Sequence, residues 1–175
     1  MTSSNVNIGL INPKSPDNVS SIMRAAGNYQ VDKIFYTGTR YKRALHNQGR
    51  TVDLSRKVSN SVSVTATNCL LDAVEKGVTI VCVELVINAI PLPEYQHPDN
   101  AFYIFGPEDG SIEQEIIDKA DAVIYIPTIG CMNLAATVNV LLYDRLAKTK
   151  HIATGNERIT QSRDRNNRLK LNKID

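Results

Sequence analysis

The sequence has little of what marks a secreted, disulfide-rich or metal-dependent protein. It contains no Trp, only three Cys and only three His among 175 residues. An odd number of widely separated cysteines is typical of a reducing compartment and argues against a disulfide scaffold. The Cys and His residues also lie at none of the spacings that a zinc site requires, so no bound metal is expected.

A long hydrophobic run is also missing. The most apolar stretch, residues 134–146, is interrupted by Asn139, Asp144 and Arg145, and a membrane-spanning helix needs about 20 apolar residues. The opening segment, MTSSNVNIGL, lacks the basic and apolar regions of a signal peptide. We therefore expect a cytoplasmic protein that does not associate with membranes.

What is present is the composition of an ordinary globular chain, with 42% hydrophobic and 22% charged residues. A chain of this length corresponds to one domain, which can bury about 70% of its unfolded surface without disulfides or metals. We expect one domain over residues 1–150. A basic C-terminal tail with few apolar residues to bury should follow it over residues 151–175.

Charge is distributed unevenly, although the net charge is only +2. Residues 1–57 contain nine Lys and Arg against three Asp and Glu, residues 58–147 three against twelve, and residues 148–175 eight against three. Such basic clusters can follow a nucleic-acid backbone, although a solvated surface and a flexible tail would have the same composition. The N-terminal cluster consists of Arg40, Lys42, Arg43, Arg50, Arg56 and Lys57.

Short apolar runs alternate with helical patterns along most of the chain. This alternation predicts an α/β fold with a mostly parallel sheet and helices on both faces. Strands are expected at residues 7–11, 33–37, 78–85, 101–105 and 122–126. Helices are expected after the cap Asp17, at 41–47, at 68–76, from the cap Ser111 to 119, and from the cap Asn133 to 148.

Three loops that follow strands are the candidate ligand-binding segments, because parallel α/β sheets bind ligands beyond the carboxyl ends of their strands. These loops are 12–21, 106–111 and 127–133. They contain neither G-x-G-x-x-G nor G-K-[ST], which argues against ordinary NAD or nucleoside triphosphate binding. Taken singly, Arg24 could hold a phosphate or only face solvent, Glu108 could be a solvated turn residue, and Asn133 could be a simple helix cap.

Together, the three loops resemble the three motifs of the TrmH (SpoU) family of RNA 2′-O-methyltransferases, within the SPOUT superfamily. Residues 18–24, Asn-Val-Ser-Ser-Ile-Met-Arg, are similar to the family's Asn-x5-Arg motif, and residues 105–108, Phe-Gly-Pro-Glu, to its Gly-x-Glu turn. Residues 126–140, which begin with Ile-Pro and contain Cys-Met-Asn-Leu, are similar to its third motif. The resemblance covers roughly residues 5–148.

The resemblance implies methyl transfer from S-adenosylmethionine to a ribose 2′-hydroxyl, without a metal, by a homodimer whose C-terminal part forms a trefoil knot. In such a dimer, Arg24 of one subunit acts near the methyl donor of the other. Because a separate RNA-binding domain is missing, compact family members suggest tRNA rather than rRNA as the substrate. The family's catalytic residues correspond to Asn18, Arg24, Glu108 and Asn133, and its cofactor-binding residues to Glu84, Leu85, Gly106, Ile126, Cys131, Met132 and Leu134.

Three positions depart from the family pattern: Ser20 and Ser111 replace glycine, and Cys131 replaces serine. They keep open a non-catalytic alternative, a dimeric RNA-binding or ribosome-assembly protein on the same fold. A base methyltransferase of the superfamily is a second alternative, against which the motif from Asn18 to Arg24 argues. Arginine is effectively never deprotonated, so Arg24 is expected to clamp a phosphate rather than act as a base. The dimer interface is expected on the apolar side of the last helix, with Leu134, Ala135, Val138, Leu141, Leu142 and Leu146.

Overall fold

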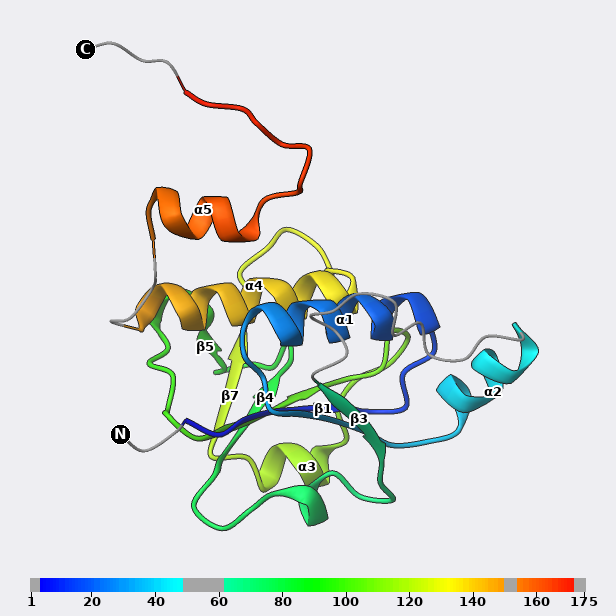
Figure 1. Cartoon of the computed structure of the whole chain (residues 1–175). Helices are drawn as coiled ribbons and strands as arrows, with labels where there is room; N and C mark the ends of the chain where they lie inside the picture. Colours follow the sequence, from blue (N-terminus) through cyan, green and yellow to red (C-terminus); the bar gives the residue numbers. More distant parts are fainter. Residues whose placement is uncertain (1–3, 49–61, 150–153, 172–175) are drawn as a thin grey trace.

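The chain folds around one parallel β-sheet (Figure 1). A computed structural model describes residues 4–48, 62–149 and 154–171. Within them the sheet has seven strands in the order β3-β2-β1-β6-β4-β7-β5, and all paired strands are parallel. The strands are β1 (Val6–Leu10), β2 (Lys33–Tyr36), β3 (Ser63–Ala66), β4 (Thr79–Val83), β5 (Ile90–Pro91), β6 (Ala101–Phe105) and β7 (Ala122–Tyr125).

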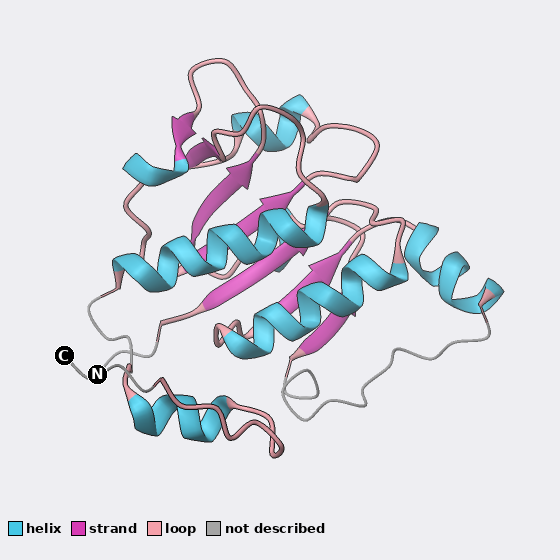
Figure 2. Cartoon of the chain, turned by 90° about the horizontal axis from the view of Figure 1, so that it is seen from above, coloured by secondary structure: helices cyan, strands magenta, loops and turns pink. Residues whose placement is uncertain are grey.

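Helices cover both faces of the sheet. On one face, α1 (Pro16–Asn28) and α4 (Leu134–Lys148) lie side by side, and α3 (Gln114–Asp118) lies on the other (Figures 1 and 2). This arrangement confirms the predicted α/β class, with a mostly parallel sheet and helices on both faces. The remaining described elements are α2 (Arg40–Asn47), the 3-10 turns η2 (Leu71–Ala73) and η3 (Leu92–Glu94), and the tail helix α5 (Asn156–Ser162).

The two faces of the sheet have separate apolar cores, because side chains alternate along a strand. All five residues of β6 are buried. Tyr103 and Phe105 pack in the core beneath α1 and α4, whereas Phe102 and Ile104 pack on the opposite face with Leu70. Burial on both faces explains why this strand reads as a continuous apolar run.

The central strands end at a common edge of the sheet. Leu10 of β1 pairs with Phe105 of β6, which in turn pairs with Val83 of β4. The loops that follow these strands therefore begin side by side, as expected for ligand-binding loops of a parallel sheet. The trefoil knot that the family resemblance implies stays a prediction.

The first helix begins differently from the prediction. Its N-cap is Ser15, whose hydroxyl accepts a hydrogen bond from the Asn18 amide at 3.3 Å, and not Asp17, which lies in the first turn. Proline favours the first helical position. Pro16 at that position therefore places the cap at Ser15, two residues before Asp17, and the dipeptide Ser-Pro is the stronger signal.

The helix expected from Ser111 begins later, at Gln114. The Ile112 amide donates to the Glu84 carboxylate at 3.0 Å, and Glu113 has extended backbone. Glu113 therefore takes the N-cap position, and the helix begins one residue after it. Ser111 is exposed and is not the cap.

The remaining differences lie in the connections between elements. The prediction of a helix over residues 68–76 is wrong, since only the turn η2 is helical there. Such short helices are marginal on their own, and Leu70 is buried against the sheet. The strands β3 and β5 were not predicted, because β3 is mostly exposed and β5 has only two residues.

The basic tail contains the short helix α5, and its larger apolar side chains, Ile159, Leu169 and Leu171, are exposed. The division into a domain over residues 1–150 and a tail over 151–175 stays a prediction. Part of the predicted basic clusters lies outside the described residues, namely Arg50, Arg56, Lys57, Lys150 and Lys173.

The long helix α4 buries its apolar side within its own chain. Leu134, Ala135, Val138, Leu141 and Leu142 are at most 8% exposed and pack in the core shared with α1. The interface prediction is therefore wrong for these five of its six residues, since core side chains are not available to a partner. Leu146 is half-buried, and the dimer itself stays a prediction. The outward side of α4 carries a different stripe of exposed residues at helical spacing, namely Ala136, Val140, Tyr143 and Ala147.

A buried polar cluster ties the C-terminal half of α4 to the connection before β6. His97 lies with Nδ1 2.7 Å from the Tyr103 hydroxyl and with Nε2 2.9 Å from the Asp144 carboxylate. Lys148 pairs with Asp144 at 2.7 Å, and Arg145 donates to the Tyr103 hydroxyl at 3.0 Å. Burial lowers the pKa of His97 below its ordinary value of 6.5; Asp144 opposes this shift, whereas Arg145 and Lys148 reinforce it.

Candidate active site

The three motifs meet in a network of side-chain hydrogen bonds at the edge of the sheet. Asn18, in the first turn of α1, donates from Nδ2 to Glu108 Oε1 at 3.2 Å. Asn133, the N-cap of α4, donates from Nδ2 to Asn18 Oδ1 at 3.0 Å. Asn133 Oδ1 in turn accepts from the amides of Ala135 and Ala136 at 2.9 and 3.3 Å. We call Asn18, Glu108 and Asn133 the motif network.

The direction of each hydrogen bond in the motif network is fixed from its two ends. A carboxylate only accepts hydrogen bonds, so the amide nitrogen of Asn18 must face Glu108. The backbone amides at the start of α4 only donate, so the carbonyl oxygen of Asn133 must face them. The remaining two side-chain atoms then match, with Asn133 donating to Asn18. Each carboxamide therefore has a single orientation.

Glu108 is held far more firmly than a solvated turn residue. Its carboxylate accepts hydrogen bonds from the backbone amides of Lys14 and Ser15 at 2.9 and 3.0 Å, and its side chain is only 15% exposed. Burial acts to raise the pKa of Glu108, but the hydrogen bonds from these amides, its own amide and Asn18 outweigh burial and lower the pKa below the usual 4.5. The anionic carboxylate thus anchors the loop after β1 to the turn after β6.

Arg24 does not take part in the motif network. It lies on the exposed side of α1, six residues after Asn18, and six helical residues span about 9 Å along the axis. Within the described chain it is also absent from the cavity next to the network. A single chain thus joins three of the four predicted catalytic residues and leaves the fourth on the outward surface of α1.

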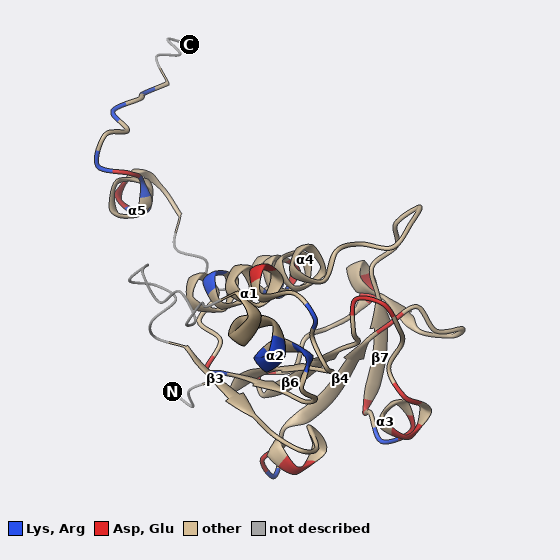
Figure 3. Ribbon diagram, turned by 90° about the vertical axis from the view of Figure 1, so that its right-hand side faces the viewer, with Lys and Arg blue, Asp and Glu red and all other residues tan. Residues whose placement is uncertain are grey.

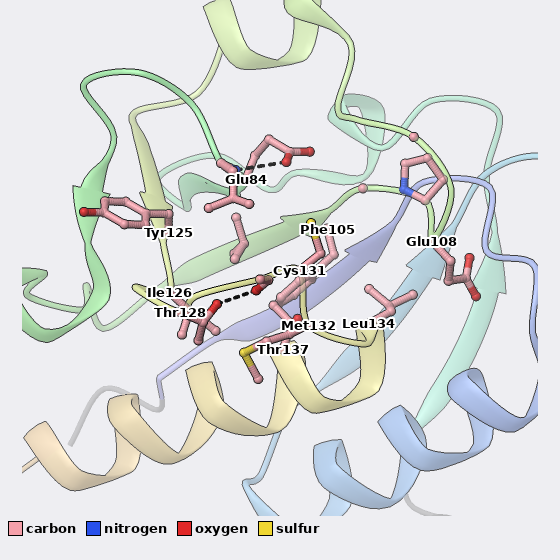
Figure 4. Close-up of a pocket in the computed structure, with 16 residues that line it drawn as sticks. Glu84, Phe105, Glu108, Tyr125, Ile126, Thr128, Cys131, Met132, Leu134 and Thr137 are labelled. Carbon is pink, nitrogen blue, oxygen red and sulfur yellow. Dashed lines mark hydrogen bonds between the residues drawn. The ribbon is translucent and has the colours of Figure 1, made fainter.

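A cavity of about 180 Å³ lies beside the motif network, where the loops after β4, β6 and β7 meet the start of α4 (Figure 4). Glu108 forms part of its wall. Segments that are far apart in the sequence thus meet at one site. Its lining includes all seven residues predicted to bind the cofactor, namely Glu84, Leu85, Gly106, Ile126, Cys131, Met132 and Leu134.

One wall of the cavity depends on the contact between Glu84 and the turn after β6. The Glu84 carboxylate accepts hydrogen bonds from the amides of Leu85 and Ile112 at 2.9 and 3.0 Å. A Cβ atom at Gly106 would lie 3.1 Å from Glu84 Oε2 and 3.4 Å from the Ile112 nitrogen. A side chain at position 106 would therefore press on the link that shapes this wall, which accounts for glycine there.

Several cavity residues were missed by the sequence prediction, among them Tyr125, Thr128 and Thr137. The Thr128 hydroxyl donates to the Gly130 carbonyl at 2.7 Å, and the Thr137 hydroxyl donates to the Asn133 carbonyl at 3.0 Å. Thr128 and Thr137 both lie within the third motif, residues 126–140, and Tyr125 directly precedes it. Including the hydroxyl residues of that motif and one more residue before it would have identified all three.

The described residues contain no group of three or more His, Cys, Asp or Glu side chains placed to hold a metal ion. Burial, and to a lesser degree Glu84, raises the pKa of the Cys82 thiol to about 12, so this thiol stays protonated at neutral pH. None of the described helices has both the length and the apolar character needed to cross a membrane.

The sequence matches the profile of the SpoU rRNA Methylase family over residues 5–143. This match covers most of the chain, so the protein belongs to that family. Family membership confirms the resemblance that the three motifs indicated. Among curated proteins, no sequence is similar enough to give a match.

Solved structures of methyltransferases share the fold. An AdoMet-bound rRNA methyltransferase from Sinorhizobium meliloti aligns with a TM-score of 0.67 at 16% identity, over 83% of this chain and 57% of that one. The A. aeolicus TrmH/SpoU tRNA modifying enzyme aligns with a TM-score of 0.67 at 22% identity, over 81% of this chain and 74% of that one. A structure described by its 2-OH methylation of C/U34 on tRNA gives 0.65 at 17% identity, over 85% and 92%. This chain therefore spans less than two thirds of the first of these proteins but nearly all of the third.

Proposed function

We propose that the protein transfers a methyl group from S-adenosylmethionine to a ribose 2′-hydroxyl of RNA, with tRNA as the favoured substrate. One observation carries the proposal. Asn18, Glu108 and Asn133 come from the three separate motifs of the family, yet they form one network beside a cavity. The family gives the reaction class, and the motif network indicates where the chain would carry it out.

The cavity has the chemical character that S-adenosylmethionine requires. Leu85, Ile126 and Met132 offer apolar surface for a flat adenine ring, and hydroxyl and backbone groups can hold the polar parts. Gly106 leaves the backbone open to close approach. When bound, S-adenosylmethionine supplies an electrophilic methyl carbon on a positively charged sulfur. A family relative, the Sinorhizobium enzyme, was solved with AdoMet bound, which supports this assignment.

The protein's own contribution is to align the acceptor oxygen and stabilise the charge that develops as its proton leaves. The motif network holds the two loops between which the ribose would lie. Arginine presents a planar guanidinium whose geometry matches that of a phosphate. We therefore assign Arg24 to the RNA phosphate next to the reactive ribose, where its charge also stabilises the developing alkoxide.

Arg24 does not line the cavity of its own chain. In a dimer, Arg24 would instead lie at the cavity of the partner. Arg24 lies on the outward side of α1, and α1 packs beside α4 on the same face of the sheet (Figure 2). The outward stripe of α4, Ala136, Val140, Tyr143 and Ala147, contains no charged residue. Val140 and Tyr143 in this stripe are large, exposed side chains and are available to a partner. We propose that the stripe packs against a second copy, so that Arg24 of one protomer serves the cavity of its partner.

The distribution of charge supports an RNA substrate. Lys and Arg cluster on α2, whereas α3, which covers the sheet face opposite α1 and α4, carries mainly Asp and Glu (Figure 3). Lys42 and Arg43 of α2 are exposed and can contact phosphates electrostatically. The solved structure of similar fold that is aligned over 92% of its own chain is described by 2-OH methylation of C/U34 on tRNA, which supports tRNA as the favoured substrate.

Two measurements test the proposal. Isothermal titration with S-adenosylmethionine should show one site per chain, and mass spectrometry of nucleosides after incubation with tRNA should show 2′-O-methylated ribose. A protein that binds RNA but not the methyl donor would instead support the non-catalytic alternative. Methyl groups found on a base would support the base methyltransferase.

A further inference from the structure

The arginine at the start of α2 connects two of the motif loops. Arg40 donates from Nε and Nη2 to the Asn12 carbonyl at 3.0 and 2.7 Å. Its Nη1 donates to both carboxylate oxygens of Asp109 at 2.7 and 2.9 Å, and its Nη2 lies 3.8 Å from Glu108 Oε2. One guanidinium thus spans from the loop after β1 to the turn after β6.

The backbone at Asn12 and in the turn before α2 has the unusual conformation that the contact with Arg40 requires. Asn12 has a φ of +41° and Gly38 a φ of +77°, both in the left-handed region. A Cβ atom at Gly38 would overlap the Asn12 side-chain amide, so only glycine lets the turn before α2 approach this closely. The backbone amide of Asn12 also donates to the Thr37 hydroxyl at 3.2 Å. The turn before α2 is therefore built against Asn12.

The position of Asn12 decides what surrounds Glu108. The amides of Lys14 and Ser15, which bind the Glu108 carboxylate, follow Asn12 by two and three residues. Arg40 fixes this loop from one side through the Asn12 carbonyl and fixes the opposing turn through Asp109, the residue next to Glu108. Glu108 in turn accepts the hydrogen bond from Asn18 Nδ2 and so holds one of the two ends of that side chain.

We infer that Arg40 is a positioning residue for methyl transfer: its guanidinium clamps the loop after β1 to the turn after β6, so that Glu108 holds Asn18 in its productive orientation. The inference rests on the proposed function for its catalytic consequence. It also separates Arg40 from the basic cluster in which the sequence places it. Its side chain is only 29% exposed and is paired with carboxylates, whereas Lys42 of the same helix is exposed.

The test compares Arg40→Met with Lys42→Ala, which removes one positive charge from the same helix without touching the clamp. For Arg40→Met we expect kcat for methyl transfer to fall by about 10- to 100-fold, the loss that a misplacement of about 1 Å can cause. KM for tRNA and affinity for S-adenosylmethionine should stay near wild type. Lys42→Ala should show the opposite split, with KM raised and kcat unchanged.

Two further variants separate positioning from folding. Asp109→Asn weakens one arm of the clamp and leaves Arg40 in place, so its kcat should lie between those of wild type and Arg40→Met. Arg40→Lys restores the charge but not the planar fork that reaches both loops, so it should rescue kcat only in part. Wild-type kcat in Arg40→Met, or full rescue by lysine, would overturn the inference.

A readout without turnover keeps this inference distinct from the proposed function. Carbon NMR of Glu108 should show its pKa rising in folded Arg40→Met and, to a lesser degree, in Arg40→Lys, which keeps the positive charge near the carboxylate, because the amides of Lys14 and Ser15 are no longer held on it. If the wild type transfers no methyl group but this pKa rises, the proposed function fails and the clamp stands. An unchanged pKa of Glu108 would overturn the clamp whatever the activity.

Discussion

Replacing Asn133 by alanine should reduce both stability and activity, and the structure allows the two losses to be assigned to different contacts. The side chain caps α4 through the amides of Ala135 and Ala136 at 2.9 and 3.3 Å, and loss of such a cap costs about 0.5–2 kcal/mol. Asn18 also loses its donor, but water can reach this half-buried side chain, so the added cost is about 0.5 kcal/mol. A total of about 1.5 kcal/mol lowers Tm by about 3–6 °C for a chain of this length.

Asn133→Asp is the matched control for this prediction. Aspartate keeps the capping oxygen and adds a negative charge at the helix N-terminus, so it should keep most of the stability. It cannot donate to Asn18, so methyl transfer should fall as in Asn133→Ala, whereas affinity for S-adenosylmethionine should stay near wild type because the start of α4 beside the cavity keeps its cap. Thermal unfolding, isothermal titration and nucleoside mass spectrometry measure the three quantities. Wild-type transfer by Asn133→Asp would refute the reasoning, because the bond to Asn18 would then be dispensable.

Three further predictions concern other parts of the chain. Arg24→Ala should abolish methyl transfer and leave titration with S-adenosylmethionine unchanged; equal losses of both would contradict its assignment to the acceptor. Tyr143→Lys should give a folded monomer in sedimentation, whereas Leu142→Glu should unfold the chain; a wild type that sediments as a monomer would disprove the dimer. His97→Gln should flatten the loss of stability in acid. Because the folded pKa of His97 is lowered from 6.5, the wild type keeps its full contribution above pH 6.5 and loses it as pH falls below that value. If the stability of His97→Gln fell with decreasing pH as steeply as that of the wild type, the polar cluster around His97 could not be the cause of the acid sensitivity.

Those parts of the fold that depend on local signals could be predicted from the sequence. The apolar run Ala101–Phe105 predicts a buried strand without any knowledge of its neighbours in the sheet, and all five of its residues are buried. Asn133 caps α4 as predicted, because an asparagine before a helical apolar pattern satisfies the free amides of that helix by itself. Ser15 follows the same principle. The dipeptide Ser15-Pro16 marks the start of α1 in the sequence, whereas the predicted cap, Asp17, lies inside the helix.

What could not be predicted depends on contacts between distant segments. Arg40 meets Asp109 across 69 residues of sequence, and nothing near Arg40 distinguishes it from Lys42 and Arg43. The apolar pattern of α4 shows that one side of the helix is buried, but it does not say whether the burial is within the chain or against a partner. Only the packing of Leu142 in the core decides this.

The edge of the sheet explains why the site is held by polar side chains rather than by packing. Loops that receive a ligand must leave a cavity open, so they cannot be fixed by filling the space between them with apolar groups. Here hydrogen bonds run from the amides of α4 through Asn133 and Asn18 to Glu108. Arg40 lies next to the other oxygen of that carboxylate and ends this series of contacts. The same bonds cap α4 and hold the loop after β1. Stability of the helix and geometry of the site are therefore coupled at Asn133, and only a substitution that keeps the capping oxygen can separate them.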